Sequence, residues 1–255
     1  MERKNSMNYN YGNNDPNQVY VNGKPVPMNA QQQQAFSDQS FINAVMIRAF
    51  LFMFIAVLLT AVVAIYTASS GLYMVIMQNP MMIALIVIAE LAFVIVGNRM
   101  SAKNSKAGSG ICLFGYSIVN GLLFASVFLA YNMQFITYVF LITALMFGVT
   151  ALVGAVTKKS LANLGGYLMM GLIGLLIALV VNLFVRSSAM DFVLSVVGVL
   201  LFVGLTAYDT QKIKAMAAMN TGYDMSVLGL WGAMDLYLDF INLFLYLLRI
   251  FGSRE

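Results

Sequence analysis

Four acidic residues lie inside long apolar segments of the sequence, where charged groups are rare. They are Glu90, Asp209, Asp235 and Asp239. Placing an acidic residue at the centre of a membrane-spanning helix costs roughly 2.5–3.5 kcal/mol. Chains keep such groups where they pair, line a hydrated cavity or take part in transport. These four carboxylates are therefore the candidate functional residues.

The spacing of two of these acids indicates proton chemistry. Asp235 and Asp239 are four residues apart, so they lie on one face of a helix. Two carboxylates in a poorly hydrated site cannot both be ionised cheaply, so a pair shares one proton and titrates as a unit. The chain contains no histidine. Carboxylates are therefore the natural groups for sensing pH near neutrality.

The composition indicates a membrane protein. Of 255 residues, 61% are hydrophobic and 9% are charged, against about 25% charged residues in soluble domains. The absence of histidine excludes imidazole catalysis and histidine-ligated metal sites, and the single cysteine, Cys112, excludes an intrachain disulfide. With no phosphate loop, nucleotide fold or haem ligand pair, we expect no enzyme, no cofactor and no nucleic-acid partner. The expected surroundings are a lipid bilayer.

Seven apolar runs have about the length needed to cross the hydrocarbon core of a bilayer. We therefore predict an all-α membrane protein with seven transmembrane helices in residues 41–252. Residues 1–40 are rich in Asn and Gln and poor in large aliphatic residues, which predicts a disordered tail. The runs are Ala44–Tyr66, Val75–Val96, Gly110–Tyr131, Phe135–Val156, Leu164–Val185, Phe192–Tyr208 and Val227–Phe251.

Positive charges gather in alternate connections between the runs. Arg186 is the single positive residue in the connections after the first, third and fifth runs. The positive-inside rule then places the tail in the cytoplasm. An odd number of spans in a cell membrane places the C-terminus outside, whereas a last helix that crosses only in part would leave it inside. The other connections hold Arg99, Lys103, Lys106, Lys158, Lys159, Lys212 and Lys214.

Two motifs carry a family resemblance. The segment 204–211 reads Gly-Leu-Thr-Ala-Tyr-Asp-Thr-Gln, and 236–244 reads Leu-Tyr-Leu-Asp-Phe-Ile-Asn-Leu-Phe. Together they resemble the Bax-inhibitor (transmembrane Bax inhibitor motif) family, over about residues 40–252. The resemblance implies seven helices, with a central last helix surrounded by the other six.

The same resemblance implies a function and a site. Bacterial-type members imply a pH-sensitive calcium leak, in which one aspartate of helix 6 and one of helix 7 share a proton and latch the cytoplasmic side. Carried over, these residues are Asp209 and Asp239, which are also the candidate calcium ligands. The resemblance also implies that an acidic residue and an arginine of helix 2 take part in the site. Glu90 and Arg99 are the candidates here, although the local sequence match is looser.

The residues themselves leave the partner of Asp209 open. At 1.5 Å per residue, Asp209 lies about 27 Å from the outer end of its helix, Asp235 about 24 Å and Asp239 about 18 Å. Depth therefore favours Asp235 as the partner, and the motif favours Asp239. Asp209 alone could also be an interfacial residue near Lys212.

Plainer interpretations exist for other parts of the pattern. Glu90 could simply pair with Arg99. A Tyr-Asp on one helix and an aspartate on the next outline an intramembrane aspartyl protease, but no Gly-x-Gly precedes Asp239 and no Pro-Ala-Leu follows it. The alternative to a leak that conducts calcium under proton control is a non-conducting regulatory protein. Such a protein would act through a membrane partner such as a quality-control protease.

Overall fold

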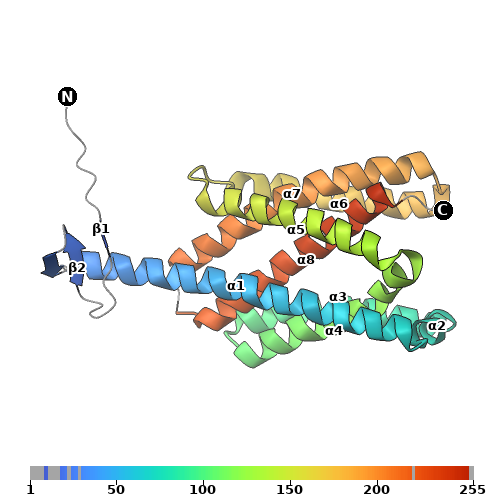
Figure 1. Ribbon diagram of the computed structural model, residues 1–255, viewed down its shortest axis with the longest axis horizontal. Coiled ribbons are helices and arrows are strands. Elements are labelled where there is room, and N and C mark those ends of the chain that lie inside the picture. Colours follow the sequence, from blue (N-terminus) through green and yellow to red (C-terminus); the bar gives the residue numbers. More distant parts are fainter. Residues whose placement is uncertain (1–8, 11–17, 22–23, 28–29, 220–221, 253–255) are drawn as a thin grey trace.

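The computed structural model describes residues 9–10, 18–21, 24–27, 30–219 and 222–252, and it is helical from Ala30 onward (Figure 1). Three short strands precede the helices and pair antiparallel in the order β1-β2-β3. The strands are β1 (Tyr9–Asn10), β2 (Gln18–Val21) and β3 (Lys24–Pro27). The helices are α1 (Ala30–Ser69), α2 (Leu72–Met77), α3 (Pro80–Ala102), α4 (Lys106–Ala130), α5 (Met133–Val156), α6 (Ala162–Val185), α7 (Ser188–Met219) and α8 (Met225–Phe251).

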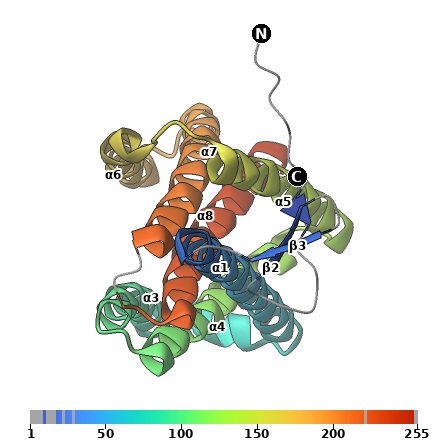
Figure 2. The same ribbon diagram turned by 90° about the vertical axis from the view of Figure 1, so that its left-hand side faces the viewer.

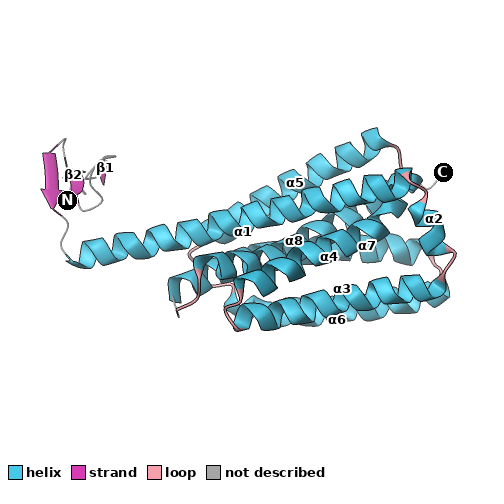
Figure 3. Cartoon of the chain, turned by 90° about the horizontal axis from the view of Figure 1, so that it is seen from below, coloured by secondary structure: helices cyan, strands magenta, loops and turns pink. Residues whose placement is uncertain are grey.

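The first helix begins earlier than the apolar pattern indicates. We expected a tail up to residue 40, but α1 starts at Ala30 and extends beyond the other helices at its amino end (Figure 3). The Gln-rich segment 31–34 has no helix breaker, so the helix continues into it. Most of residues 1–29 lie outside the described part of the chain, and the disorder of the tail stays a prediction.

Helix α8 is the most enclosed element. It packs against α1, α3, α4, α5 and α7, and the views in Figures 1 and 2 place it among them. Its fully buried side chains include Tyr237, Leu236 and Leu243. The expectation of six surrounding helices is wrong in one respect, because among the described residues α6 packs against α7 and not against α8.

In the described part of the chain, six helices are long and apolar enough to cross a membrane, namely α1, from Asp38 onward, and α3 to α7. Much of their surface is apolar and open to the surroundings, for example Phe184, which is 80% exposed. Such a surface requires lipid around it. Helix α8 has 27 residues, enough to cross, but it holds Asp235, Asp239 and Arg249 and is not among these six.

The second predicted span is broken in the structure. Pro80 is the first residue of α3, where its missing N–H costs nothing. Asn79 caps the helix by accepting a hydrogen bond from the Met81 amide at 3.0 Å. The residues before it form the separate six-residue α2, which follows Gly71 at φ +75°. The run 75–96 is therefore two helices.

The sixth predicted span is longer than its apolar run. Helix α7 has 32 residues and continues to Met219. Lys212 and Lys214, which the sequence pattern places in a connection, thus belong to the last turns of a helix. This places Lys212 one turn from Asp209, at the i, i+3 spacing that lets the two side chains meet.

A close approach of two backbones fixes α5 against α7. A methyl group at Gly154 would collide with the backbone oxygen and Cα of Ala207. Backbone atoms inside a helix cannot move aside, so Gly154→Ala should destabilise the fold by about 1–3 kcal/mol. Thermal unfolding of the purified protein in detergent would measure this effect.

Gly148, in the same helix, is the matched control, because nothing lies within 4 Å of a methyl group there. Gly148→Ala should leave stability unchanged or raise it by up to about 1 kcal/mol, because alanine is the better helix former. Equal effects of the two substitutions would contradict the packing of α5 on α7.

Candidate functional site

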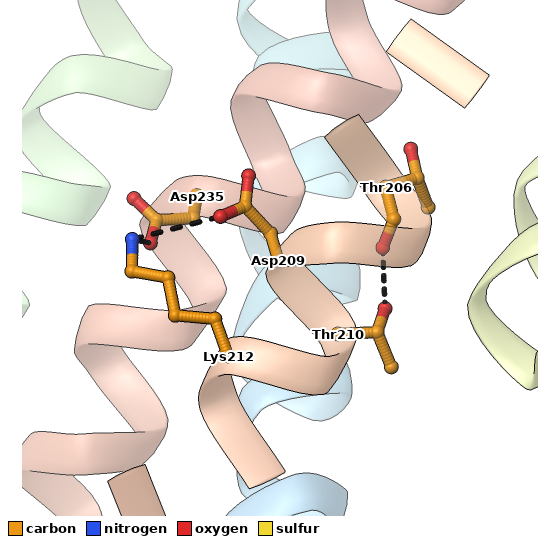
Figure 4. Close-up of polar contacts among 5 residues, drawn as sticks. All are labelled: Thr206, Asp209, Thr210, Lys212 and Asp235. Carbon is orange, nitrogen blue, oxygen red and sulfur yellow. Dashed lines mark hydrogen bonds and ion pairs between the residues drawn. The ribbon is translucent and has the colours of Figure 1, made fainter. Parts of the chain in front are cut away.

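Lys212 joins two carboxylates that come from different helices (Figure 4). Its Nζ donates to Asp235 Oδ2 on α8 at 2.8 Å and lies 3.5 Å from Asp209 Oδ1 on its own helix, α7. The side chains of Asp209 and Asp235 are 12% and 18% exposed, and that of Lys212 is 36% exposed. The lysine thus links Asp209 to Asp235, and the Asp209 carboxyl also lies within hydrogen-bonding reach of Asp239, so the structure brings both candidate partners to Asp209.

Asp239 forms the deepest part of this cluster. It is only 3% exposed, and its Oδ2 atom has no hydrogen-bond partner. Its carboxyl lies near enough to Asp209, Asp235 and Lys212 for the charges to interact. Within the described residues, the cluster thus holds three carboxyls and one ammonium. We call these four residues, Asp209, Lys212, Asp235 and Asp239, the carboxylate cluster.

Two threonines of α7 lie beside the cluster, and Thr206 is close enough for its hydroxyl to interact with the Asp239 carboxyl. Thr206 and Thr210 are fully buried on α7. Each hydroxyl donates to the carbonyl of the preceding turn of its own helix at 2.7 Å, Thr206 to Phe202 and Thr210 to Thr206 (Figure 4). This bonding pattern uses the hydroxyl proton locally. Lys212 is therefore the charged donor on which the carboxylates depend.

Other residues of the same turns of α7 hold the connection between α5 and α6. Gln211 accepts a hydrogen bond from the Leu161 amide at 2.6 Å and donates to the carbonyls of Thr157 and Lys159 at 3.2 and 3.0 Å. Lys214 donates to the Ala155 carbonyl at 2.8 Å. Two adjacent residues of α7 therefore have different partners: Lys212 binds Asp235 of α8, and Gln211 binds the connection between α5 and α6.

Polar contacts fix the start of α8 around Asp224, which lies outside the candidate membrane spans. Asp224 caps the helix by accepting a hydrogen bond from the Ser226 amide at 2.7 Å, and this hydrogen bond lowers the pKa of the Asp224 carboxyl from its ordinary value. The Asn104 side chain accepts from the Asp224 amide at 2.9 Å, which joins the α3–α4 connection to α8. Arg48 of α1 donates to the Ser226 hydroxyl at 3.1 Å.

Glu90 lies in a separate polar group. Its Oε1 accepts from Asn120 Nδ2 of α4 at 3.0 Å, and the same amide is 3.4 Å from the Tyr116 hydroxyl. Nearby, the Tyr237 hydroxyl meets Thr60 of α1 at 2.6 Å, and its ring stacks edge-on against Tyr116 at 5.6 Å. Glu90 therefore lies apart from the carboxylate cluster and has no direct bond to it.

The interpretation of Glu90 and Arg99 as an ion pair is wrong. Arg99 is exposed at the end of α3 and forms no ion pair within the described residues, where both ion pairs involve Lys212. Nine residues along a helix span about 13 Å, which is too far for direct contact. The structure thus gives Arg99 no place in the carboxylate cluster.

No group of three or more acidic or cysteine side chains is arranged as a metal site in the described part of the chain. Calcium ligation by Asp209 and Asp239 stays a prediction. A cavity of about 730 Å³ lies where α4, α5 and α8 meet, lined by Tyr131, Asn132 and Arg249. An apolar cavity of about 440 Å³ lies between α1 and α5 over Phe240. The carboxylate cluster lines neither cavity.

Sequence reasoning missed the groups that complete these contacts. The i, i+3 spacing of Asp209 and Lys212 was visible, but nothing in the sequence showed that the same ammonium reaches Asp235. Gln211 lies inside the recognised motif without a role assigned to it. Asn120 and Tyr116 lie in an apolar helix, and no spacing signal linked them to Glu90.

Two aspartates of the cluster should respond oppositely to neutral substitution. Asp235→Asn removes the closest charged partner of Lys212 and should destabilise the protein by about 1–3 kcal/mol. Asp239→Asn removes a buried carboxyl that has an unpartnered oxygen and lies beside two other carboxyls. It should therefore raise the unfolding temperature at pH 8. Thermal unfolding in detergent would measure both.

Asp38→Asn is the control, because Asp38 is exposed at the start of the first span and should have little effect. A loss of stability for Asp239→Asn equal to that for Asp235→Asn would contradict the assignment of Asp235 as the principal partner of Lys212.

Comparison with known proteins agrees with this architecture. Residues 42–255 match the family model described as "Inhibitor of apoptosis-promoting Bax1". The chain is 42% identical over 218 residues to the inner membrane protein YbhL of Escherichia coli K12, covering 84% of this chain and 93% of that protein. It is 37% identical over 233 residues to an uncharacterized protein of Deinococcus radiodurans, covering 89% and 99%.

An uncharacterized membrane protein of Streptococcus pyogenes serotype M1 is 35% identical over 191 residues, covering 75% of this chain and 83% of that protein. The matched region begins at the first apolar helix and includes every helix that bears the carboxylate cluster. The chain is therefore a multi-pass membrane protein that belongs to the Bax-inhibitor family.

Proposed function

We propose that this protein is a pH-sensitive calcium leak of the cell membrane, with the carboxylate cluster as the latch between α7 and α8. The observation that carries the proposal is the placement of three carboxyls and one ammonium at a helix interface in a membrane protein. Such groups are costly to hold there and are typical of ion and proton pathways. In this proposal α8 is the seventh span, the tail is cytoplasmic and the C-terminus is outside.

The latch follows from the charges that face one another. Asp209 on α7 faces Asp235 and Asp239 on α8, with Lys212 between the helices and Tyr208 nearby. One ammonium neutralises one carboxylate. A proton shared between Asp209 and Asp239 removes a second charge and holds the helices together. Loss of that proton leaves like charges in contact, and their repulsion separates α7 from α8.

The same carboxylates suit the proposed ion. Calcium takes six to eight oxygen ligands in flexible geometry. The aspartates of the cluster offer carboxylate oxygens from two helices, and backbone carbonyls and water would complete the shell as α7 and α8 separate. Protons and calcium then compete for one set of oxygens, which makes the leak depend on pH.

Calcium flux into proteoliposomes loaded with a calcium dye tests the latch. The wild-type protein should pass calcium at a rate that changes between pH 6 and pH 8. Asp209→Asn and Asp239→Asn should each shift the pH midpoint by about one unit or more or abolish the dependence, because an amide cannot share the proton.

Asp224→Asn is the matched control. Its carboxyl lies outside the spans and its pKa is lowered by the bond from Ser226, so it stays charged over this range and the curve should not move. Unchanged curves for both Asp209→Asn and Asp239→Asn would overturn the latch. Absence of flux in the wild type would instead favour the non-conducting regulatory protein acting through a membrane partner.

A further inference from the structure

We infer that Lys212 is a tethered counter-cation that competes with a divalent cation for the carboxylates of Asp209 and Asp235. This inference rests on the proposed function, and it assigns to Lys212 the control of cation affinity at the same site. The ammonium lies 2.8 Å from Asp235 Oδ2 and 3.5 Å from Asp209 Oδ1, at the position between two helices that a bound cation would neutralise.

The lysine is placed so that it can leave the site. Its side chain is 36% exposed, whereas those of Asp209 and Asp235 are 12% and 18% exposed. The ammonium ends a flexible four-carbon stem. It can therefore swing toward the exposed side while the two aspartates keep their positions, so exchange with a cation from solution does not require α7 and α8 to unfold.

The charge balance favours exchange with a divalent rather than a monovalent ion. Within the described residues, Lys212 is the only ammonium that meets the carboxylates, since Lys214 is bound to the Ala155 carbonyl. A single positive charge leaves part of the negative charge of Asp209, Asp235 and Asp239 uncompensated. A divalent ion in the same position compensates more of it, whereas a monovalent ion gains nothing over the lysine.

Competition of this kind has a measurable consequence. When a tethered group occupies a site most of the time, the apparent affinity for a free ligand is the intrinsic affinity multiplied by the fraction of time that the site is open. Removal of the ammonium opens the site permanently and leaves two carboxylates without a counter-charge. Both effects increase the affinity for a divalent cation.

Equilibrium binding of radioactive calcium to the full-length protein in lipid nanodiscs tests this inference. Lys212→Met keeps the length and apolar stem of the side chain and removes the charge. This variant should bind calcium at least about tenfold more tightly than the wild type does. Lys212→Arg keeps the charge and should bind within about threefold of the wild type. Lys212→Gln replaces Lys212→Met if the latter does not fold.

Lys214→Met is the matched control, with the same change two residues away, and should bind as the wild type does. The gain should disappear in the double variant Lys212→Met with Asp235→Asn, because one of the two freed carboxylates is then absent. Calcium binding by Lys212→Met no tighter than that of the wild type, or an equal gain in Lys212→Arg, would overturn the inference.

This outcome is separate from the flux measurement. Tighter binding in Lys212→Met without any wild-type flux would support the counter-cation and reject the leak. Flux with the expected pH dependence but unchanged binding in Lys212→Met would support the leak and reject the counter-cation.

Discussion

The constraint that governs this structure is the need to compensate buried carboxylates at the contact of α7 and α8, where one ammonium meets one carboxylate on each helix. In a low-dielectric interior an uncompensated carboxylate is costly, and Asp239 adds a third with an unpartnered oxygen. The charges alone therefore do not hold α7 and α8 together. Apolar contacts must do so, such as the Tyr246 ring packed closely against Gly198 and stacked 5.8 Å from Phe202.

The position of α8 explains how the membrane domain contains these acids. A helix that faces lipid cannot hold two aspartates at low cost, because hydrocarbon offers no partner. Helix α8 is enclosed by five other helices, so Asp235 and Asp239 meet Lys212 and protein atoms rather than lipid. The six helices that are apolar enough to cross a membrane carry much of the exposed apolar surface of the described residues, while α8 holds two aspartates inside the bundle. Enclosure by protein is thus the condition for a titratable site in this fold.

The sequence predicts the apolar helices well because lipid demands a fixed length of apolar residues. It predicts the charged contacts less well, since the rise per residue gives depth along a helix but not which helices are neighbours. Depth and motif each named one neighbour of Asp209, and neither indicated that Lys212 links it to Asp235. Glu90 meets Asn120 rather than Arg99 because α3 packs on α4. Helix ends were wrong where a polar helix continues past its apolar run, as α7 does to Met219.

The arrangement on α7 also couples the cluster to a distant part of the chain. Asp209 and Lys212 face α8, while Gln211, which lies between them in sequence, binds three backbone groups of the α5–α6 connection. Consecutive residues of a helix point in different directions, so one rigid turn of α7 contacts both partners. A rotation of α7 that separates Asp209 from α8 must therefore also strain the Gln211 contacts. Both sets of contacts therefore hold this turn of α7 in one position, and a latch of the proposed kind must break them together.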